Sequence, residues 1–199
     1  MEITSVVGSP RSNGSCARVA RAMVDALAEK TTSVRTYELN KLRYRGCQGC
    51  WACKNGSESC VTQDDLSPVL DALKQSDVVV VSTPVYVGES TAQFKGLVDR
   101  LFSFTPPDFK TNPTATRLPP GKKLVLIVSQ GNPDEQAFGN VVERYEALFR
   151  RLGFEEVYPI RVCGAEDRTV LRLSKETVDL VNATAAKILA EHSGLARRA

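Results

Sequence analysis

Residues 77–82 read Asp-Val-Val-Val-Val-Ser, and this run decides the fold class. Four successive β-branched apolar residues leave no polar position for a solvent-facing side, so they predict a strand buried on both faces. Such strands occur in parallel sheets whose two faces are covered by helices. The run therefore predicts an α/β protein.

On both sides of this run, strand-like segments alternate with segments that have apolar residues at helical spacing. We expect strands at residues 3–7, 34–39, 77–82, 123–128 and 157–162. We expect helices around residues 19–27, 64–73, 94–102, 138–152 and 178–189. The second helix should open with Asp64 and Asp65, whose charges suit the positive end of a helix dipole. Five such pairs indicate a three-layer, doubly wound parallel sheet, although periodicity alone does not give the strand order.

Length and composition favour one domain, over residues 1–193, with a tail at 194–199. The 26 basic and 23 acidic residues give a net charge of +3, which is too even to indicate a nucleic-acid or anionic membrane partner. The first seven residues include Glu2 instead of a basic segment, so we expect no signal peptide. No apolar run approaches the length of a membrane span. We therefore expect a cytoplasmic protein.

Two segments interrupt the alternation of strands and helices. Residues 46–61 hold four cysteines, and residues 103–122 hold five of the ten prolines. A proline-rich excursion of this length is typical of a lid, an oligomer contact or a mobile loop. Phe102, Phe104 and Phe109 are apolar groups that a monomer would expose, so they favour assembly into an oligomer.

The segment between the first strand and the first helix suits a phosphate group. Residues 8–16 read Gly-Ser-Pro-Arg-Ser-Asn-Gly-Ser-Cys. Backbone N–H groups at a helix N-terminus bind phosphate, and the forked cation of Arg11 can grip two phosphate oxygens. The segment lacks G-x-G-x-x-G and the P-loop lysine, which argues against a dinucleotide site and nucleotide hydrolysis. The alternative is an ordinary turn in which Ser12 or Asn13 caps the helix.

Four of the six cysteines follow the pattern C-x2-C-x2-C-x6-C: Cys47, Cys50, Cys53 and Cys60. In a reducing compartment such a group indicates metal or redox chemistry. A 4Fe–4S cluster needs four thiolates, of which a tight loop can supply three and a more distant cysteine the fourth. Val61 follows Cys60 where a bacterial ferredoxin has proline, so this is not a ferredoxin motif.

Three alternatives to a cluster remain open for these cysteines. A structural zinc normally joins two C-x2-C pairs across a longer gap, which fits less well. A disulfide, for example between Cys47 and Cys60, could form on oxidation. The loop could also carry no metal at all. Trp51 is interpreted as a packing anchor, without a chemical role.

Three motifs together resemble a known family, over about half of the chain. Residues 8–15 resemble the FMN loop of the NADPH-dependent FMN reductase branch of flavodoxin-like proteins. Thr-Pro-Val-Tyr at 83–86 and Lys-Gly-Leu-Val-Asp-Arg at 95–100 resemble that family's T-P-x-Y and K-x-x-x-D-R signature. The cysteine segment, followed by two aspartates, resembles the iron–sulfur flavoproteins of strictly anaerobic microbes.

The resemblance implies a flavodoxin-like sheet of order 2-1-3-4-5 with its ligand at the carboxyl edge. It implies FMN as cofactor, with the phosphate surrounded by Ser9, Arg11, Asn13, Ser15 and Cys16. It places the isoalloxazine and ribityl chain along Pro84, Val85, Tyr86 and Val87, and the flavin's far side beside Ser129, Gln130 and Gly131. Lys95 and Asp99 would support the site and the subunit contact; the alternative is a surface ion pair between these two residues, at i and i+4. The resemblance also implies a cluster near the FMN of a neighbouring subunit, and hence a homodimer or homotetramer. Family members commonly have Asn-Thr where this chain has Ser15-Cys16, so Cys16 is expected to contribute only its backbone N–H, because a thiol is a weak donor.

The resulting function hypothesis is electron transfer by FMN and a 4Fe–4S cluster, between a reduced donor and a partner protein or small acceptor. A second hypothesis is a cluster-free FMN or quinone reductase with NAD(P)H as donor. A third is a zinc-bearing interaction module that is not an enzyme. No side chain is expected to be catalytic, because the flavin carries the chemistry. A hydrolase is disfavoured, because no G-x-S-x-G is present and His192, the only histidine, lies outside every candidate site.

Overall fold

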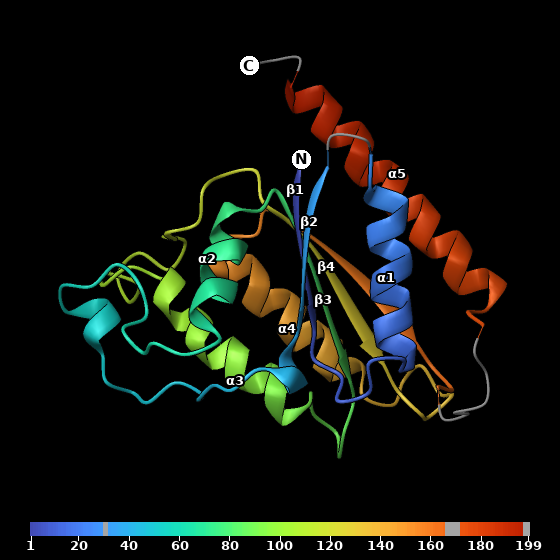
Figure 1. Ribbon diagram of the computed structural model, residues 1–199, viewed down its shortest axis with the longest axis horizontal. Coiled ribbons are helices and arrows are strands. Elements are labelled where there is room, and N and C mark those ends of the chain that lie inside the picture. The colour runs from blue at the N-terminus through green and yellow to red at the C-terminus, as the bar shows by residue number, and fades with distance from the viewer. Residues whose placement is uncertain (30–31, 166–171, 197–199) are drawn as a thin grey trace.

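The computed structural model describes residues 1–29, 32–165 and 172–196, which form a five-stranded sheet with helices on both faces (Figure 1). The strands are β1 (Glu2–Val7), β2 (Ser33–Glu38), β3 (Val78–Pro84), β4 (Lys123–Ser129) and β5 (Glu156–Val162). The helices are α1 (Ser15–Leu27), α2 (Ser67–Gln75), α3 (Ala92–Arg100), α4 (Gly139–Leu152) and α5 (Lys175–Ala196). Short 3-10 helices are η1 (Leu39–Lys41), η2 (Ala52–Lys54) and η3 (Leu101–Phe104).

All strand pairs are parallel, and the strand order is β2-β1-β3-β4-β5. This confirms the expected fold class and order. The chain order reverses between β1 and β3, so the connections that follow these two strands leave toward opposite faces of the sheet. Such a point opens a crevice at the carboxyl edge, where ligands bind in folds of this kind.

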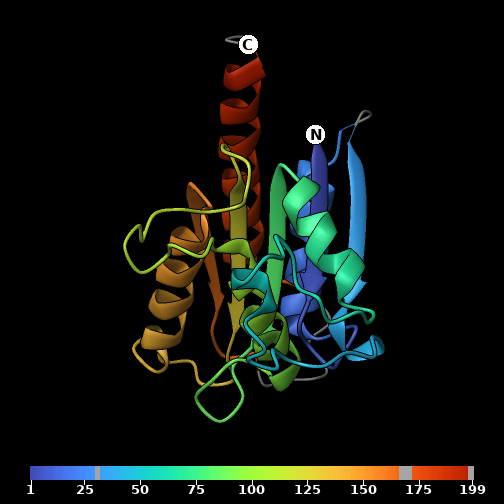
Figure 2. The ribbon, with the colours of Figure 1, turned by 90° about the vertical axis from the view of Figure 1, so that its left-hand side faces the viewer.

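Alternate residues of each central strand contribute to two separate cores, as the valine run predicts. Val79 and Val81 pack into the core that also includes residues of α2, α3 and α4. Val78 and Val80 pack into the core formed with α1 and α5. Figures 1 and 2 show these two helical layers on opposite sides of the sheet.

The second helix begins later than its sequence predicts. Helix α2 starts at Ser67, with Leu66 as N-cap, so Asp64 and Asp65 lie outside it. Asp64 accepts a hydrogen bond from the backbone N–H of Arg45, and Asp65 accepts one from Arg43. The interpretation that the two aspartates open the helix was therefore wrong. They precede α2, and their carboxylates bind the backbone of residues 43–45 in the loop before the cysteine segment.

Helix α5 continues to Ala196, so residues 194–196, which we expected in a tail, are helical. Residues 197–199 of that expected tail lie outside the described residues. None of the helices described is both long enough and apolar enough to cross a membrane.

The two interrupting segments lie next to each other, beside α2 and α3 (Figures 1 and 2). The ring of Trp51 in the cysteine segment lies edge-on to Phe102, at 5.8 Å between centroids, and 6.4 Å from Phe109. Trp51 is thus a packing anchor, although about half of its surface remains exposed.

The three phenylalanines do not form the exposed apolar patch that the sequence predicts. Phe104 is fully buried in the core below α2 and α3. Phe102 and Phe109 are partly buried and lie edge-on to each other at 5.2 Å. Their packing within the chain removes this argument for an oligomer.

Candidate functional site

A cavity of about 460 Å³ opens at the carboxyl edge of the sheet, beyond the ends of β1, β3 and β4. This volume lies within the range of small-molecule sites. All but one of its lining residues come from the predicted cofactor-binding set. The lining consists of Arg11, Pro84, Val85, Tyr86, Ser129, Gln130, Gly131 and Ala165.

The loop after β1 is pressed against β3 and α3. The backbone N–H of Gly8 donates to the carbonyl oxygen of Ser82 at 2.7 Å. A Cβ atom at Gly8 would lie 2.8 Å from that oxygen and 2.9 Å from Cβ of Phe94, so only glycine fits. Thr91 also fixes the loop, because its hydroxyl donates to the Gly8 carbonyl at 2.6 Å while capping α3 through the N–H of Phe94. Thr91 was missed from the sequence.

Helix α1 begins without the cap that the alternative interpretation required. Its N-cap is Gly14, and in the described structure this residue makes no side-chain capping bond. Ser12 donates its hydroxyl to Glu38 instead, and the side-chain oxygen of Asn13 accepts from Arg21 at 3.1 Å. The capped-turn alternative was therefore wrong, and the positive end of α1 faces the loop that leads to the cavity.

Two arginines of α1, which the sequence analysis did not single out, brace this loop from outside. Arg18 donates to the carbonyl oxygen of Asn13 at 3.0 Å, and Arg21 donates to that of Ser12 at 2.9 Å. Arg18 also contacts the hydroxyl of Ser15, at 3.5 Å. Asn13 on the loop and Ser15, the first residue of α1, therefore lie outside the cavity lining.

The two other residues predicted for the phosphate site, Ser9 and Cys16, lie deeper. Ser9 is buried, and its hydroxyl exchanges hydrogen bonds of 3.1 Å with the backbone N–H and carbonyl of Arg11. The side chain of Cys16 is fully buried. Burial raises the pKa of the Cys16 thiol, against the opposing effect of hydrogen bonds with Ser129, Ser9 and Ser82. The exposed guanidinium of Arg11 is the group of this loop that lines the cavity.

Residues 86–89 form a tight hairpin at the cavity's edge. Tyr86 and Glu89 exchange two backbone hydrogen bonds, of 2.7 and 3.1 Å. The turn residues Val87 and Gly88 have positive φ angles of 50° and 79°, an unusual conformation for a β-branched residue. Tyr86 lines the cavity, whereas Val87 is fully exposed at the tip and does not line it.

Glu89 ties this hairpin to α4. Its carboxylate forms an ion pair with Arg144 and accepts a hydrogen bond of 2.9 Å from the hydroxyl of Tyr145. Partial burial raises the pKa of Glu89. The hydrogen bonds from the N–H of Ser90 and from Tyr145, together with Arg144, lower this pKa by more than burial raises it, so the net shift is downward. Sequence reasoning missed this connection.

The far side of the cavity is held by Gln130. Its side-chain amide donates to the carbonyl oxygens of Asn132 and Asp134, at 2.9 and 2.8 Å. Arg161 donates to its side-chain oxygen, at 2.6 Å in the shorter of two bonds. The backbone N–H of Val85 donates to the carbonyl oxygen of Ser129 at 2.7 Å and joins the ends of β3 and β4.

All four predicted metal-ligating cysteines line a second, small cavity of about 40 Å³, together with Trp51, Arg100 and Phe102. Cys47 and Cys50 are exposed, Cys53 and Cys60 are partly buried, and all four are free thiols. Across the part of the chain that is described, no three Cys, His, Asp or Glu side chains are arranged to hold one metal ion.

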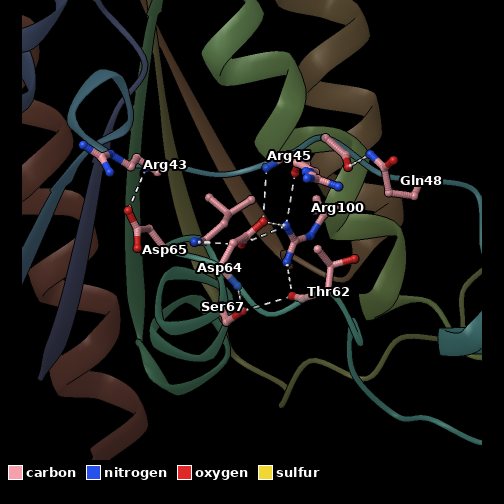
Figure 3. Close-up of polar contacts among 10 residues, drawn as sticks. Arg43, Arg45, Gln48, Thr62, Asp64, Asp65, Ser67 and Arg100 are labelled. Carbon is pink, nitrogen blue, oxygen red and sulfur yellow. Dashed lines mark hydrogen bonds and ion pairs between the residues drawn. The ribbon is translucent and has the colours of Figure 1, made fainter.

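One buried arginine closes the base of this cysteine segment (Figure 3). Arg100 donates to both oxygens of Asp64, at 2.8 and 3.0 Å. It also donates to the carbonyl oxygens of Arg45 and Thr62, at 3.1 and 2.8 Å. Since these two residues flank segment 46–61, both ends of the segment meet at one guanidinium.

The pKa of Asp64 reflects this arrangement. Partial burial raises it, but hydrogen bonds from Arg100 and from the N–H groups of Arg45 and Leu66 lower it below its usual value of 3.8. The signature motif 95–100 thus contributes its final arginine to the cysteine segment. Its Lys95 and Asp99 form an exposed i,i+4 ion pair of 2.5 Å, and neither residue lines the cavity at the carboxyl edge.

Lys54 belongs to the same segment, and its side chain is buried. Its ammonium donates to the carbonyl oxygens of Phe102 and Thr105, at 2.5 and 2.6 Å. It lies 3.9 Å from the centre of the Phe102 ring. Burial lowers the pKa of Lys54, whereas the neighbouring thiols of Cys53 and Cys47 raise it. Nothing in the local sequence pattern indicated that this lysine is buried.

Comparison with curated proteins gives relatives with one recurring name. The chain is 31% identical over 100 residues to an iron-sulfur flavoprotein of Methanosarcina thermophila, which is 50% of this chain and 52% of that protein. It is 35% identical over 100 residues to an iron-sulfur flavoprotein of Methanocaldococcus jannaschii, at 50% of each chain. The chain thus spans about half the length of these relatives.

Solved structures share the fold at low sequence identity. An FMN-dependent NADH-azoreductase from Bacillus anthracis, solved in complex with FMN, superposes with a TM-score of 0.71 at 14% identity. The match covers 94% of this chain and 99% of that one. An NAD(P)H:quinone oxidoreductase from Methanothermobacter marburgensis gives 0.69 at 15% identity, over 93% and 94%. The family model described as flavodoxin-like fold matches residues 1–181, and the chain therefore belongs to the flavodoxin-like family.

Proposed function

We propose that this protein is an FMN-dependent redox flavoprotein that transfers electrons between a reduced donor and an acceptor. The observation that carries the proposal is the cavity at the carboxyl edge, which is lined by seven of the twelve residues expected to hold FMN. We call it the flavin-edge cavity below. The names of the curated relatives and the FMN complex of a structural neighbour support it.

The residues at this edge fit the chemical parts of FMN. The positive end of α1, its backbone N–H groups and the guanidinium of Arg11 suit the phosphate. Pro84, Val85 and Tyr86 offer an apolar and aromatic wall for the flavin ring, with Ser129, Gln130 and Gly131 opposite. When bound, FMN supplies hydride or single-electron chemistry, while these residues bind and orient it.

We further propose that Cys47, Cys50, Cys53 and Cys60 hold a 4Fe–4S cluster. Four thiols lining one cavity form a donor set that suits it, and positive φ angles at Gly49 and Trp51 let the chain wrap closely. Binding would require the four sulfurs to move closer together, since no three of them are placed to hold one metal ion in the described part of the chain. When bound, such a cluster supplies single-electron exchange.

A cluster-free NAD(P)H-dependent FMN or quinone reductase is the second candidate, favoured by the names of the structural neighbours. The acceptor would then be a quinone or another small molecule that reaches the cavity beside the exposed Tyr86. The two candidates differ in whether the cysteine segment takes part in electron transfer.

Assembly into a dimer or tetramer also remains a proposal. A cavity of about 760 Å³ is lined by residues of α3 and α4, by Cys47 and by Glu89. The lining includes the apolar Val98, Leu148 and Leu152 and the basic Arg144 and Arg151. A second copy seated there would lie next to Cys47 of the cysteine segment and Glu89 of the hairpin 86–89, and light scattering of the purified protein tests this.

The experiment that tests the proposed function is the iron and acid-labile sulfide content per bound flavin, on protein purified without oxygen. About four of each per FMN is the expected result. Cys50→Ser should abolish the iron while FMN stays bound, because the cysteine does not line the flavin-edge cavity.

Other outcomes of this experiment separate the candidates. Flavin with negligible iron, and steady oxidation of NADH or NADPH, would favour the cluster-free reductase. Equal iron in wild type and Cys50→Ser would contradict the cysteine assignment. A colourless protein with stoichiometric zinc would overturn the flavoprotein proposal and support the zinc-bearing interaction module.

A further inference from the structure

The hairpin 86–89 has a turn that its own sequence does not favour. Its two central residues, Val87 and Gly88, have positive φ angles of 50° and 79°. A two-residue turn with positive φ at both central positions prefers Asn-Gly, because asparagine and glycine tolerate this conformation. Valine is β-branched, so the conformation is strained at position 87. Val87 is fully exposed at the tip, and packing around its side chain therefore does not offset the strain.

Strain of this kind persists only where the surrounding structure fixes the conformation. Two backbone hydrogen bonds between Tyr86 and Glu89 close the hairpin, and the carboxylate of Glu89 is bound in turn. One of its oxygens accepts from the N–H of Ser90 at 2.7 Å and from the hydroxyl of Tyr145 at 2.9 Å. The other oxygen forms the ion pair with Arg144. Three donors from outside the turn thus hold one end of the hairpin.

The hydrogen bonds around the phenol of Tyr145 have a defined direction. Its hydroxyl carries one proton, and the ionised carboxylate of Glu89 can only accept, so Tyr145 donates to Glu89. The hydroxyl of Ser90 lies 2.7 Å from the same phenol oxygen and therefore donates to it. A chain of hydrogen bonds runs from Ser90 through Tyr145 to Glu89, and its members polarise one another.

Tyr145 is itself fixed by the core of the protein. It is 2% exposed and belongs to the core that α2, α3 and α4 form with the sheet. Its ring lies edge-on to Phe94, at 5.5 Å between centroids. The phenol therefore cannot follow the hairpin if the hairpin moves, and it acts as a fixed anchor on α4.

We propose that Tyr145 is a positioning residue, which holds Glu89, keeps the strained hairpin closed and thereby keeps Tyr86 at the wall of the flavin-edge cavity. This inference rests on the proposed flavin site. Tyr86 lines that cavity, whereas Tyr145 does not. Tyr145 thus acts on the flavin only through the hairpin and takes no part in electron transfer. Loss of its hydroxyl should loosen the hairpin and weaken FMN binding, although no direct contact to the flavin is removed.

The test compares Tyr145→Phe with Tyr158→Phe. Both variants remove a buried hydroxyl that donates to a glutamate, and both keep the ring. Tyr158 donates to Glu191 of α5, in the core on the opposite face of the sheet, and does not line the flavin-edge cavity. Hydrogen exchange of the apoprotein at the N–H groups of Tyr86 and Glu89 measures closure of the hairpin. Fluorescence quenching of FMN on titration with the apoprotein measures the dissociation constant.

Tyr145→Phe should speed exchange at both N–H groups and raise the FMN dissociation constant roughly 5- to 10-fold, which corresponds to one lost hydrogen bond. Tyr158→Phe should leave both quantities at the wild-type value. Val87→Asn, added to Tyr145→Phe, gives the turn the residue that it prefers. The double variant should therefore return both quantities toward wild type.

Wild-type exchange and wild-type FMN affinity in Tyr145→Phe would overturn the inference and leave the proposed function intact. Equal effects in Tyr158→Phe would assign them to general stability and also overturn it, as would a double variant without recovery. A wild-type protein that takes up no FMN would contradict the proposed function, and the inference with it. If Tyr145→Phe does not fold, Glu89→Ala removes the carboxylate that Tyr145 holds; unchanged exchange and affinity in that variant would overturn the inference.

Discussion

Arg100 and Asp64 form a buried ion pair of 2.8 Å, and the same guanidinium holds the carbonyl oxygens on both sides of the cysteine segment. Arg100 is 1% exposed, so the pair is shielded from solvent and from salt. Its geometry makes the cysteine segment dependent on a side chain of α3.

Asp64→Asn should destabilise the protein by about 3 kcal/mol at pH 7, because it leaves the charge of Arg100 buried without its partner. The pKa of Asp64 is lowered in the folded protein, so the stabilisation is present above its usual pKa of 3.8 and is lost as the pH falls through the lower folded value. Urea unfolding should therefore show a difference from wild type that shrinks below about pH 4. Asp65→Asn is the matched control, since within the described residues exposed Asp65 accepts only from the N–H of Arg43; an equal effect in both variants would contradict the prediction.

Arg100→Lys should loosen the cysteine segment, because a single ammonium cannot reach Asp64 and both flanking carbonyl oxygens in the same fork geometry. Limited proteolysis should cleave within residues 46–61 several-fold faster than in wild type. Arg144→Lys, at the exposed ion pair with Glu89, should leave that cleavage rate unchanged. Equal rates in Arg100→Lys and wild type would show that the segment is held by other contacts.

Gly8→Ala should weaken both folding and FMN binding, since its Cβ atom would lie 2.8 Å from the Ser82 carbonyl oxygen. Overpacking of this kind costs roughly 1–3 kcal/mol, and relief of the clash would shift the phosphate loop. The melting temperature and the FMN dissociation constant measure the two effects. At Gly46 the nearest atom to a new Cβ is 3.8 Å away, so Gly46→Ala should leave both unchanged.

Arg11→Ala should weaken FMN binding roughly 10- to 100-fold, the equivalent of about 1.5–3 kcal/mol for a hydrogen bond to a charged group. Fluorescence quenching of FMN on titration with apoprotein provides the measurement. Arg35→Ala is the control, because Arg35 on β2 pairs with Glu2 and Gln75 instead. Retention of FMN at wild-type affinity would remove Arg11 from the phosphate site.

The valine run at 78–81 made the sheet predictable, because burial on both faces leaves a clear apolar pattern. The strand order needed the resemblance, since periodicity does not show which strands are neighbours. The start of α2 was misplaced because an acidic residue before a helix can bind either the N–H groups of the helix's first turn or a cation elsewhere in the chain. The first partner can be inferred from local sequence. The actual cation, Arg100, lies 36 residues from Asp64 and cannot.

The flavin-edge cavity was predictable because Pro84 and Ser129 end adjacent parallel strands, and such ends meet at one edge. Thr91, Arg18 and Lys54 were missed for a common reason. Each of them bonds to backbone carbonyl oxygens, which every residue carries, so no residue type in the sequence marks the partner.

The meeting of Arg45 and Thr62 at Arg100 makes segment 46–61 a closed hoop whose two ends lie at one place. Because its two ends lie together, we expect that a short link can replace the hoop without moving β2 or α2. The entropy cost of closing a loop changes only slowly with the length of that loop. The flavin-edge cavity shares no lining residue with the cysteine cavity. Replacement of the hoop is therefore expected to leave the carboxyl-edge cavity intact.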